Sequence, residues 1–153
     1  MTAPPTILAL GSPHADDQVG WRLIERLTET GASPLASVRI ASPWDIVPYM
    51  QSGGAWIIVD ACRSGAPLGA VHRFTASELQ CVPSDNRSTH GGSLREALDL
   101  CMALGYDLSR AQVYAIEIGD ASPGGPLSPE VRQAAVQLAD QLSQEWAANS
   151  ITS

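Results

Sequence analysis

Short apolar runs alternate along this chain with segments in which apolar residues recur at helical spacing. The apolar runs are typical of buried strands, and they span Thr6–Leu10, Ser37–Ala41, Ala55–Asp60 and Gln112–Ile118. Between them, apolar residues return every three or four positions, which predicts helices over roughly 17–31, 93–105 and 128–146. Strands that alternate with helices favour a mostly parallel sheet with helices on both faces.

Three other segments complete this prediction. Residues 43–54 predict a short helix that Pro48 breaks. Ala70–Thr75 alternates like an edge strand, and Gln80–Thr89 has the composition of a loop. No repeat or linker divides the chain. We therefore predict an α/β fold in which residues 1–153 form a single-domain three-layer sandwich around a twisted, mostly parallel sheet.

The composition of the chain argues against two classes of binding partner, nucleic acids and membranes. The net charge is −7, and all nine basic residues are Arg without forming a basic stripe, so nucleic-acid binding is not expected. The apolar runs are too short to span a bilayer, so membrane insertion is not expected either. The N-terminal sequence MTAPPTILALG lacks the features of a secretory signal. These features predict a cytoplasmic protein.

The cysteines and one histidine give little positive indication of a site. Cys62, Cys81 and Cys101 are widely spaced and form no CxxC pair, which argues against a zinc knuckle or a thioredoxin-like motif. Cys101 falls on the apolar face of a predicted helix, where cysteine is usually a core residue. His72, beside Arg73 in a predicted edge strand, is interpreted as a surface residue.

Polar groups lie where the predicted strands end. Asp16 and Asp17 follow the first strand, Asp60 ends the run IIVD, and His90 in STHGGS precedes a predicted helix. In open parallel sheets, ligands bind outside the carboxyl ends of the strands, near a switch in strand order. We therefore expect these side chains to lie over one edge of the sheet.

Carboxylates with one imidazole suit a divalent ion such as Ni, Zn, Mn or Fe, and leave coordination positions for water or substrate. Each residue also has a structural interpretation. Asp16 could instead cap the helix that follows, and Asp17 is the weaker candidate for that role. The structural alternative for Asp60 is hydrogen bonding to loop amides. The alternative for His90 is that it is an ordinary surface residue. His14, beside the acidic pair, competes for the same cleft.

Four ordered segments of the chain resemble one known family. They are LALGSPHADDQVGWRLIERL, WIIVDACRSGAPLGAVHRF, STHGGSLREALDLCMALG and VYAIEIGDASPGGPLSPEV. In order and spacing they resemble the [NiFe]-hydrogenase maturation proteases, the hydrogenase-specific C-terminal endopeptidases. The resemblance covers nearly the whole chain. It implies a twisted sheet with helices on both faces, of the phosphorylase/hydrolase-like type.

The resemblance also implies a site and an activity. Its three metal-sensing positions fall on Asp17, three residues before Gly20, on Asp60, and on His90 of the S-x-H-G motif. Asp16 would support Asp17 from behind. The implied activity is one endoproteolytic cut, which removes the C-terminal extension of a [NiFe]-hydrogenase large-subunit precursor after nickel insertion. Nickel would arrive with that substrate, so the isolated protein need not hold it.

The metal could polarise a carbonyl or activate water, and Asp17 or Asp16 could alternatively act as a general base. The opening loop departs from the family pattern, because Ser12 replaces Asn, Gln18 stands where Gly is common, and the loop is about one residue shorter. Two other functions stay open. One is a non-catalytic nickel-sensing chaperone module for the same precursor, and the other is a generic metal-dependent amide hydrolase.

Overall fold

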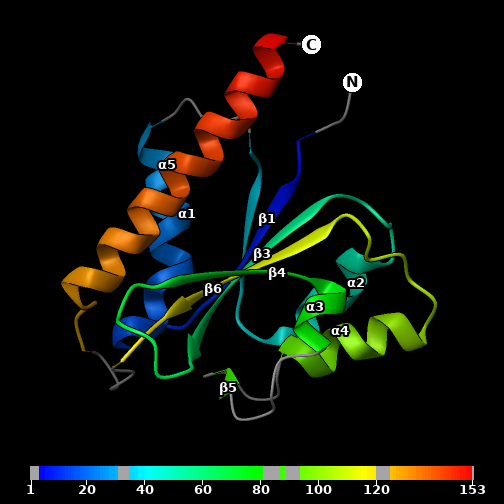
Figure 1. Cartoon of the computed structure of the whole chain (residues 1–153), viewed down its shortest axis with the longest axis horizontal. Coiled ribbons are helices and arrows are strands. Elements are labelled where there is room, and N and C mark those ends of the chain that lie inside the picture. Colours follow the sequence, from blue (N-terminus) through cyan, green and yellow to red (C-terminus); the bar gives the residue numbers. More distant parts are fainter. Residues whose placement is uncertain (1–3, 31–34, 81–86, 89–93, 120–124, 153) are drawn as a thin grey trace.

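A mostly parallel β-sheet forms the middle of the molecule (Figure 1). The computed structural model describes residues 4–30, 35–80, 87–88, 94–119 and 125–152. In these ranges the strands are β1 (Thr6–Leu10), β2 (Ser37–Ile40), β3 (Trp56–Arg63), β4 (Val71–Thr75), β5 (Arg87–Ser88) and β6 (Ala111–Glu117). Their order is β2-β1-β3-β6-β4, and β5 pairs with β3 outside this path. The pairs β1–β2, β1–β3 and β3–β6 are parallel, whereas β4 and β5 are antiparallel to their partners.

Helices cover both faces of this sheet, as predicted (Figure 1). One face is covered by α1 (Val19–Thr30) and α5 (Pro129–Thr152). The other face is covered by η2 (Pro43–Ile46), α2 (Val47–Met50), α3 (Ala76–Gln80) and α4 (Leu94–Ala103). A 3-10 turn, η1 (Ala15–Gln18), precedes α1. The predicted three-layer α/β arrangement is therefore confirmed.

The central strands read as continuous apolar runs because both of their faces are buried. Successive side chains of a strand point to opposite faces. Ile7 and Val59 accordingly belong to the core under α1 and α5, while Leu8 and Ile58 belong to the core under α4. This two-sided burial is the usual environment of parallel strands, and it explains why the run from Ile7 to Leu10 contains no polar residue.

A glycine brings the start of α1 onto the carboxyl end of β1. A Cβ atom at Gly20 would lie 2.3 Å from the backbone oxygen of Leu10, far inside van der Waals contact. The first turn of α1 therefore lies directly against the strand end. Because η1 directly precedes α1, this contact also holds Asp16 and Asp17 close to the carboxyl end of β1.

Four details of the sequence interpretation are wrong. β3 continues to Arg63, so Asp60 is not its last residue. Pro48 does not break the helical run, because it stands in the first turn of α2, where its missing N–H costs nothing. The segment Gln80–Thr89, expected to be a loop, contains the end of α3 and the short strand β5.

His72 is the fourth correction. Its side chain is only 31% exposed, and its Nε2 atom lies 3.2 Å from Oε1 of the buried Glu117. The imidazole is therefore a partly buried partner of a carboxylate and not the free surface group that the sequence suggested. Cys101 is fully buried on α4, as predicted. Across the ranges described above, no helix is both long enough and apolar enough to cross a membrane.

Candidate metal-binding and catalytic site

The two adjacent carboxylates are buried between β1 and α1. Asp16 is 0% exposed and Asp17 is 4% exposed, and both belong to η1, just past the carboxyl end of β1. His14 precedes η1 and is exposed, so it is placed differently from the acidic pair. Burying two neighbouring carboxylates costs free energy unless each of them is hydrogen-bonded. In this structure the two carboxylates have different hydrogen-bond partners.

Asp17 is held by the loop that precedes it. The Ser12 hydroxyl donates to Asp17 Oδ2 at 2.5 Å, and the Ser12 amide donates to the Asp17 carbonyl at 3.1 Å. The Asp17 amide donates to the carbonyl of His14 at 2.8 Å. The loop closes by placing Ala15 at φ +42°, a left-handed conformation that costs a non-glycine residue roughly 1 kcal/mol. A strained backbone beside a buried carboxylate is typical of functional sites.

Asp16 binds two segments that lie about a hundred residues away in the sequence. Its carboxylate accepts from the amide of Gly119 at 3.0 Å, just after β6. It also accepts from the amide and the hydroxyl of Ser128 at 2.7 and 3.0 Å, directly before α5. Asp16 therefore fastens η1 to the end of β6 and the start of α5. These bonds hold η1, which also contains Asp17, in place.

Asp60 lies in β3 at the point where the neighbouring strand β1 ends. The register pairs Ala9 with Val59, so Asp60 is the first residue of β3 beyond the paired part of β1. Its side chain is 4% exposed, and its Oδ1 accepts from the amide of Ala61 at 2.8 Å. By strand alternation it shares the sheet face with Ile58, the face that α4 covers.

Two residues singled out in the sequence, His90 and Cys81, lie outside the described residues. The structure thus places Asp16 and Asp17 just past the carboxyl end of β1, and Asp60 in β3 level with that end. The role of His90 and the joint ligand set stay predictions. Two buried carboxylates at this edge fit a divalent ion that prefers oxygen and nitrogen ligands.

The sequence did not indicate the residues that orient these carboxylates. Ser12 and Ser128 carry no motif that marks them as partners of Asp17 and Asp16. Gln18, a second departure from the family pattern, donates from Nε2 to the carbonyl of Gly125 at 3.1 Å. That carbonyl also accepts from the amide of Ala15 at 3.1 Å. Both departures in the opening loop therefore hold that loop in place.

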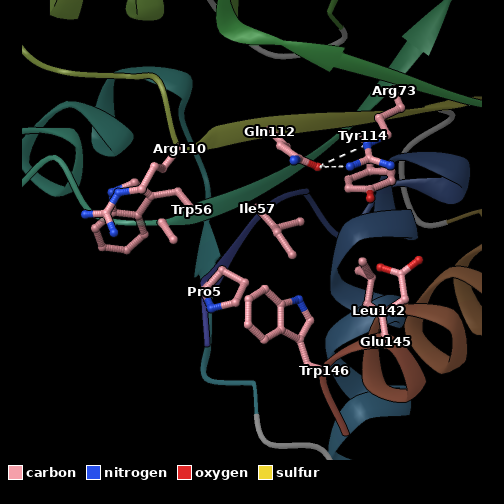
Figure 2. Close-up of a pocket in the computed structure, with 11 residues that line it drawn as sticks. Pro5, Trp56, Ile57, Arg73, Arg110, Gln112, Tyr114, Leu142, Glu145 and Trp146 are labelled. Carbon is pink, nitrogen blue, oxygen red and sulfur yellow. Dashed lines mark hydrogen bonds between the residues drawn. The ribbon is translucent and has the colours of Figure 1, made fainter. Parts of the chain in front are cut away.

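A pocket of about 150 Å³ lies at the opposite edge of the sheet (Figure 2). Pro5, Trp56 and Arg110 line it, and they stand at or just before the amino ends of β1, β3 and β6. Ligands of parallel sheets bind at the carboxyl edge. The pocket is therefore separate from the edge that carries Asp17 and Asp60.

Comparison with known proteins places this geometry in a family. Residues 41–145 match the family model HycI, described as hydrogenase maturation protease, and the match covers more than half of the chain. The chain belongs to the hydrogenase maturation protease family. The resemblance noted from the sequence is thereby confirmed, and so is the α/β fold of this maturation protease family member.

Individual relatives agree with this assignment. The hydrogenase expression/formation protein HupD of Rhodobacter capsulatus is 27% identical over 139 residues, which is 84% of this chain and 65% of HupD. The chain thus spans just under two thirds of the length of that relative. The [NiFe] hydrogenase maturation protease HybD from Thermococcus kodakarensis is 27% identical, with a TM-score of 0.70 over 94% of this chain and 99% of HybD.

A more distant solved structure supports the fold alone. The hydrogenase maturating endopeptidase HybD from E. coli is 19% identical, with a TM-score of 0.69 over 99% of this chain and 94% of that chain. The strand order and helical layers described above are therefore those of a common scaffold.

Proposed function

We propose that this protein is an endopeptidase that removes a C-terminal extension from a [NiFe]-hydrogenase large-subunit precursor after nickel has been inserted. The observation that carries the proposal is the burial of Asp17 and Asp60 at the carboxyl edge of the sheet, in a chain of the maturation protease family. Nickel is part of the substrate in this proposal, because it arrives bound to the precursor.

Each residue has a distinct part in the proposed reaction. Asp17 and Asp60, with His90, would bind the nickel that the precursor presents. Ser12 orients Asp17 through its 2.5 Å hydrogen bond, so that one carboxylate oxygen is held before substrate arrives. Asp16 keeps η1 against β6 and α5. A bound divalent ion can polarise a carbonyl or activate water.

The proposal is tested by incubating the protein with the large-subunit precursor of the same genome, loaded with nickel or left free of it. Intact mass spectrometry should show loss of the C-terminal peptide from the nickel-loaded form alone. Asp17→Asn, Asp60→Asn and His90→Ala should each stop this shortening. Asp45→Asn is the matched control, because Asp45 is an exposed carboxylate in η2, and it should process the precursor normally.

Three other results would change the assignment. Normal shortening by all three site variants would refute the proposed roles of Asp17, Asp60 and His90. A stable complex with the nickel-loaded precursor, without any shortening, would indicate the chaperone module instead. Metal-dependent cleavage of simple peptides, with no need for a folded precursor, would indicate a generic amide hydrolase.

A further inference from the structure

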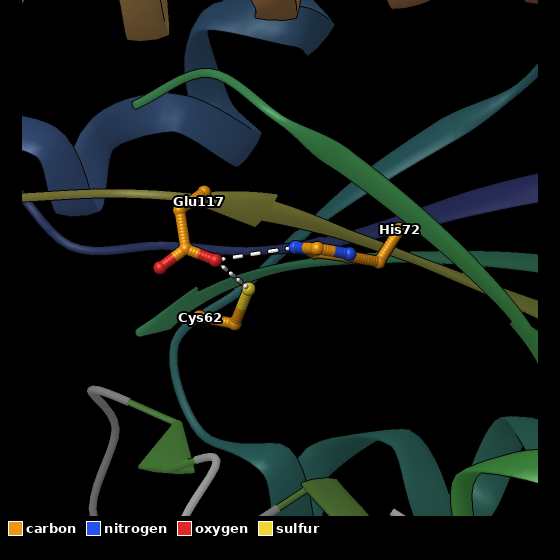
Figure 3. A group of neighbouring side chains, drawn as sticks. All are labelled: Cys62, His72 and Glu117. Atoms are coloured by element: carbon orange, nitrogen blue, oxygen red, sulfur yellow. Dashed lines mark hydrogen bonds and ion pairs between the residues drawn. The ribbon is translucent and has the colours of Figure 1, made fainter. Parts of the chain in front are cut away.

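A second group of metal-binding side chains lies farther along the same sheet. Cys62 on β3, His72 on β4 and Glu117 on β6 point toward one another (Figure 3). Oε1 of Glu117 lies 3.2 Å from His72 Nε2 and 3.6 Å from Cys62 Sγ. The three atoms all lie within 4.8 Å of one another. Three different strands thus bring a sulfur, a nitrogen and an oxygen to one point.

Hydrogen bonding accounts poorly for this convergence. Besides His72 and Cys62, the Ser64 hydroxyl also donates to Oε1 of Glu117, at 2.5 Å. A carboxylate oxygen has about two lone-pair sites, so three groups crowd a single acceptor atom. The other oxygen, Oε2, accepts from the Ser64 amide at 2.7 Å. Glu117 is only 2% exposed, so the crowded oxygen has little access to water.

We propose that Cys62, His72 and Glu117 form a binding site for a zinc-type divalent metal ion, separate from the site of Asp17 and Asp60. Thiolate, imidazole and carboxylate are the zinc ligands in proteins, and bonds of about 2.0–2.3 Å in a tetrahedron place neighbouring ligand atoms about 3.3–3.6 Å apart. The two separations from Glu117 Oε1, 3.2 and 3.6 Å, are close to that spacing, and the third pair of atoms lies within 4.8 Å. A cation between the three atoms would satisfy all of them at once.

The surroundings of the three ligands fit such a site. Ser64 fixes both oxygens of Glu117, as the outer partners of metal ligands commonly do. The imidazole of His72 stacks on Phe74 with ring centroids 6.4 Å apart, which limits its rotation. A tetrahedral ion bound by these three residues would have a fourth coordination position. The side chain of His72 is 31% exposed, which gives the cluster access to solvent. Three protein ligands with one open position are typical of zinc that binds water or a substrate donor.

This site does not depend on the proposed nickel site. Cys62 and Asp60 share a face of β3 but stand two residues apart, which separates their positions by about 6.6 Å along the strand. Asp60 is not in the group of described residues whose ligand atoms all lie within 4.8 Å of one another, so an ion bound by Cys62, His72 and Glu117 needs no ligand from Asp60. Loss of Asp60 should therefore leave metal binding at Cys62 intact, whatever happens to precursor processing.

Cobalt(II) titration of the full-length, metal-free protein tests the proposal. A cobalt ion bound by a thiolate gives an intense charge-transfer band in the near ultraviolet, and one equivalent should saturate it in the wild-type protein. Zinc should displace the cobalt and remove the band. Cys62→Ser should abolish the band, while Cys101→Ser and Cys81→Ser should retain it. Asp60→Ala should also retain it.

Two further variants separate metal binding from a structural role of the cluster. His72→Ala, on the edge strand, should weaken cobalt binding at least tenfold while circular dichroism shows an unchanged fold. Ser64→Ala should weaken it by about tenfold, because it loosens the carboxylate. Absence of the band in folded wild-type protein would overturn the proposal. A band that persists in Cys62→Ser, or that disappears in Asp60→Ala, would equally overturn it.

Discussion

Two adjacent aspartates have different tasks in this protein. Asp17 is oriented by Ser12 within its own loop, whereas Asp16 binds Gly119 and Ser128 across the fold. These bonds lead from Asp16 to the end of β6 and the start of α5. The two carboxylates therefore differ in their partners, which fits the proposal that Asp17 is the site residue and Asp16 supports it; the order of residues alone does not reveal this difference.

Replacing Asp16 tests its positioning role. Asp16→Ala leaves the amides of Gly119 and Ser128 without their acceptor in a buried place, so we expect a loss of about 2–4 kcal/mol in the free energy of unfolding. Urea denaturation measures this loss. Asp45→Ala, at an exposed position, should change the stability by less than about 0.5 kcal/mol. Equal stability of Asp16→Ala and the wild-type protein would show that the bonds of Asp16 contribute nothing to folding.

At the scale of elements, the sequence pattern predicts those helices and strands whose bounds depend on neighbouring residues in the chain. The predicted strand Thr6–Leu10 has the bounds of β1, because the residues buried on both faces, Ile7 to Leu10, are all apolar. The end of β3 was missed, because Cys62 and Arg63 continue a strand only through pairing with β5 and β6. The partners of Asp16 were also missed, since they lie 103 and 112 positions away and have no local signature.

Helix α3 was missed although the sequence does contain its start signal. The amide of Thr75 donates to Glu78 Oε1 at 3.0 Å, and the amide of Glu78 donates to Thr75 Oγ1 at 3.1 Å. This reciprocal pair is a capping box, which the spacing of Thr75 and Glu78 predicts. The backbone and side-chain hydrogen bonds with Thr75 lower the pKa of Glu78 below its usual value.

The capping box gives α3 a predictable dependence on pH. Because the folded pKa of Glu78 is lowered, its contribution to stability is fully present above the unfolded pKa, about 4.3. That contribution is lost as the pH falls through the lower folded value. We therefore expect the Tm difference between the wild-type protein and Glu78→Gln to be largest near neutral pH and to shrink below pH ~4. A Tm difference independent of pH would show that the charge of Glu78 is not involved.

The contact between α1 and β1 allows a sharper test of packing between elements. In Gly20→Ala, the new methyl group would meet the backbone oxygen of Leu10 at 2.3 Å, and neither backbone can move without shifting the helix. We expect a loss of about 1–3 kcal/mol or more in the free energy of unfolding. Gly54→Ala is the control, because its three nearest neighbours are side-chain atoms, and the closest of them, Ser52 Oγ, lies 3.3 Å away. Similar stabilities of the two variants would contradict the close approach.

At the scale of the whole molecule, the sheet separates two apolar cores. One lies under α1 and α5 and includes Leu138, while the other lies under α4 and includes Leu98. Every central strand contributes side chains to both cores, because its residues alternate between the two faces. The two helical layers therefore pack against the same strands. Unfolding of one core should disrupt these strands and thereby destabilise the other core. This sharing supports the prediction that the chain forms a single domain.

Two leucine substitutions test whether the chain unfolds as one unit. Leu138 is 3% exposed and Leu98 is 1% exposed, so Leu138→Ala and Leu98→Ala should each lower the free energy of unfolding by about 2–5 kcal/mol. Because the sheet lies between them, the losses in the double variant should add within about 0.5 kcal/mol. Urea denaturation followed by circular dichroism and by tryptophan fluorescence should give one coincident transition in every variant. If Leu138→Ala moved the transition seen by one probe and not the other, the two layers would unfold separately and the single-domain prediction would be wrong.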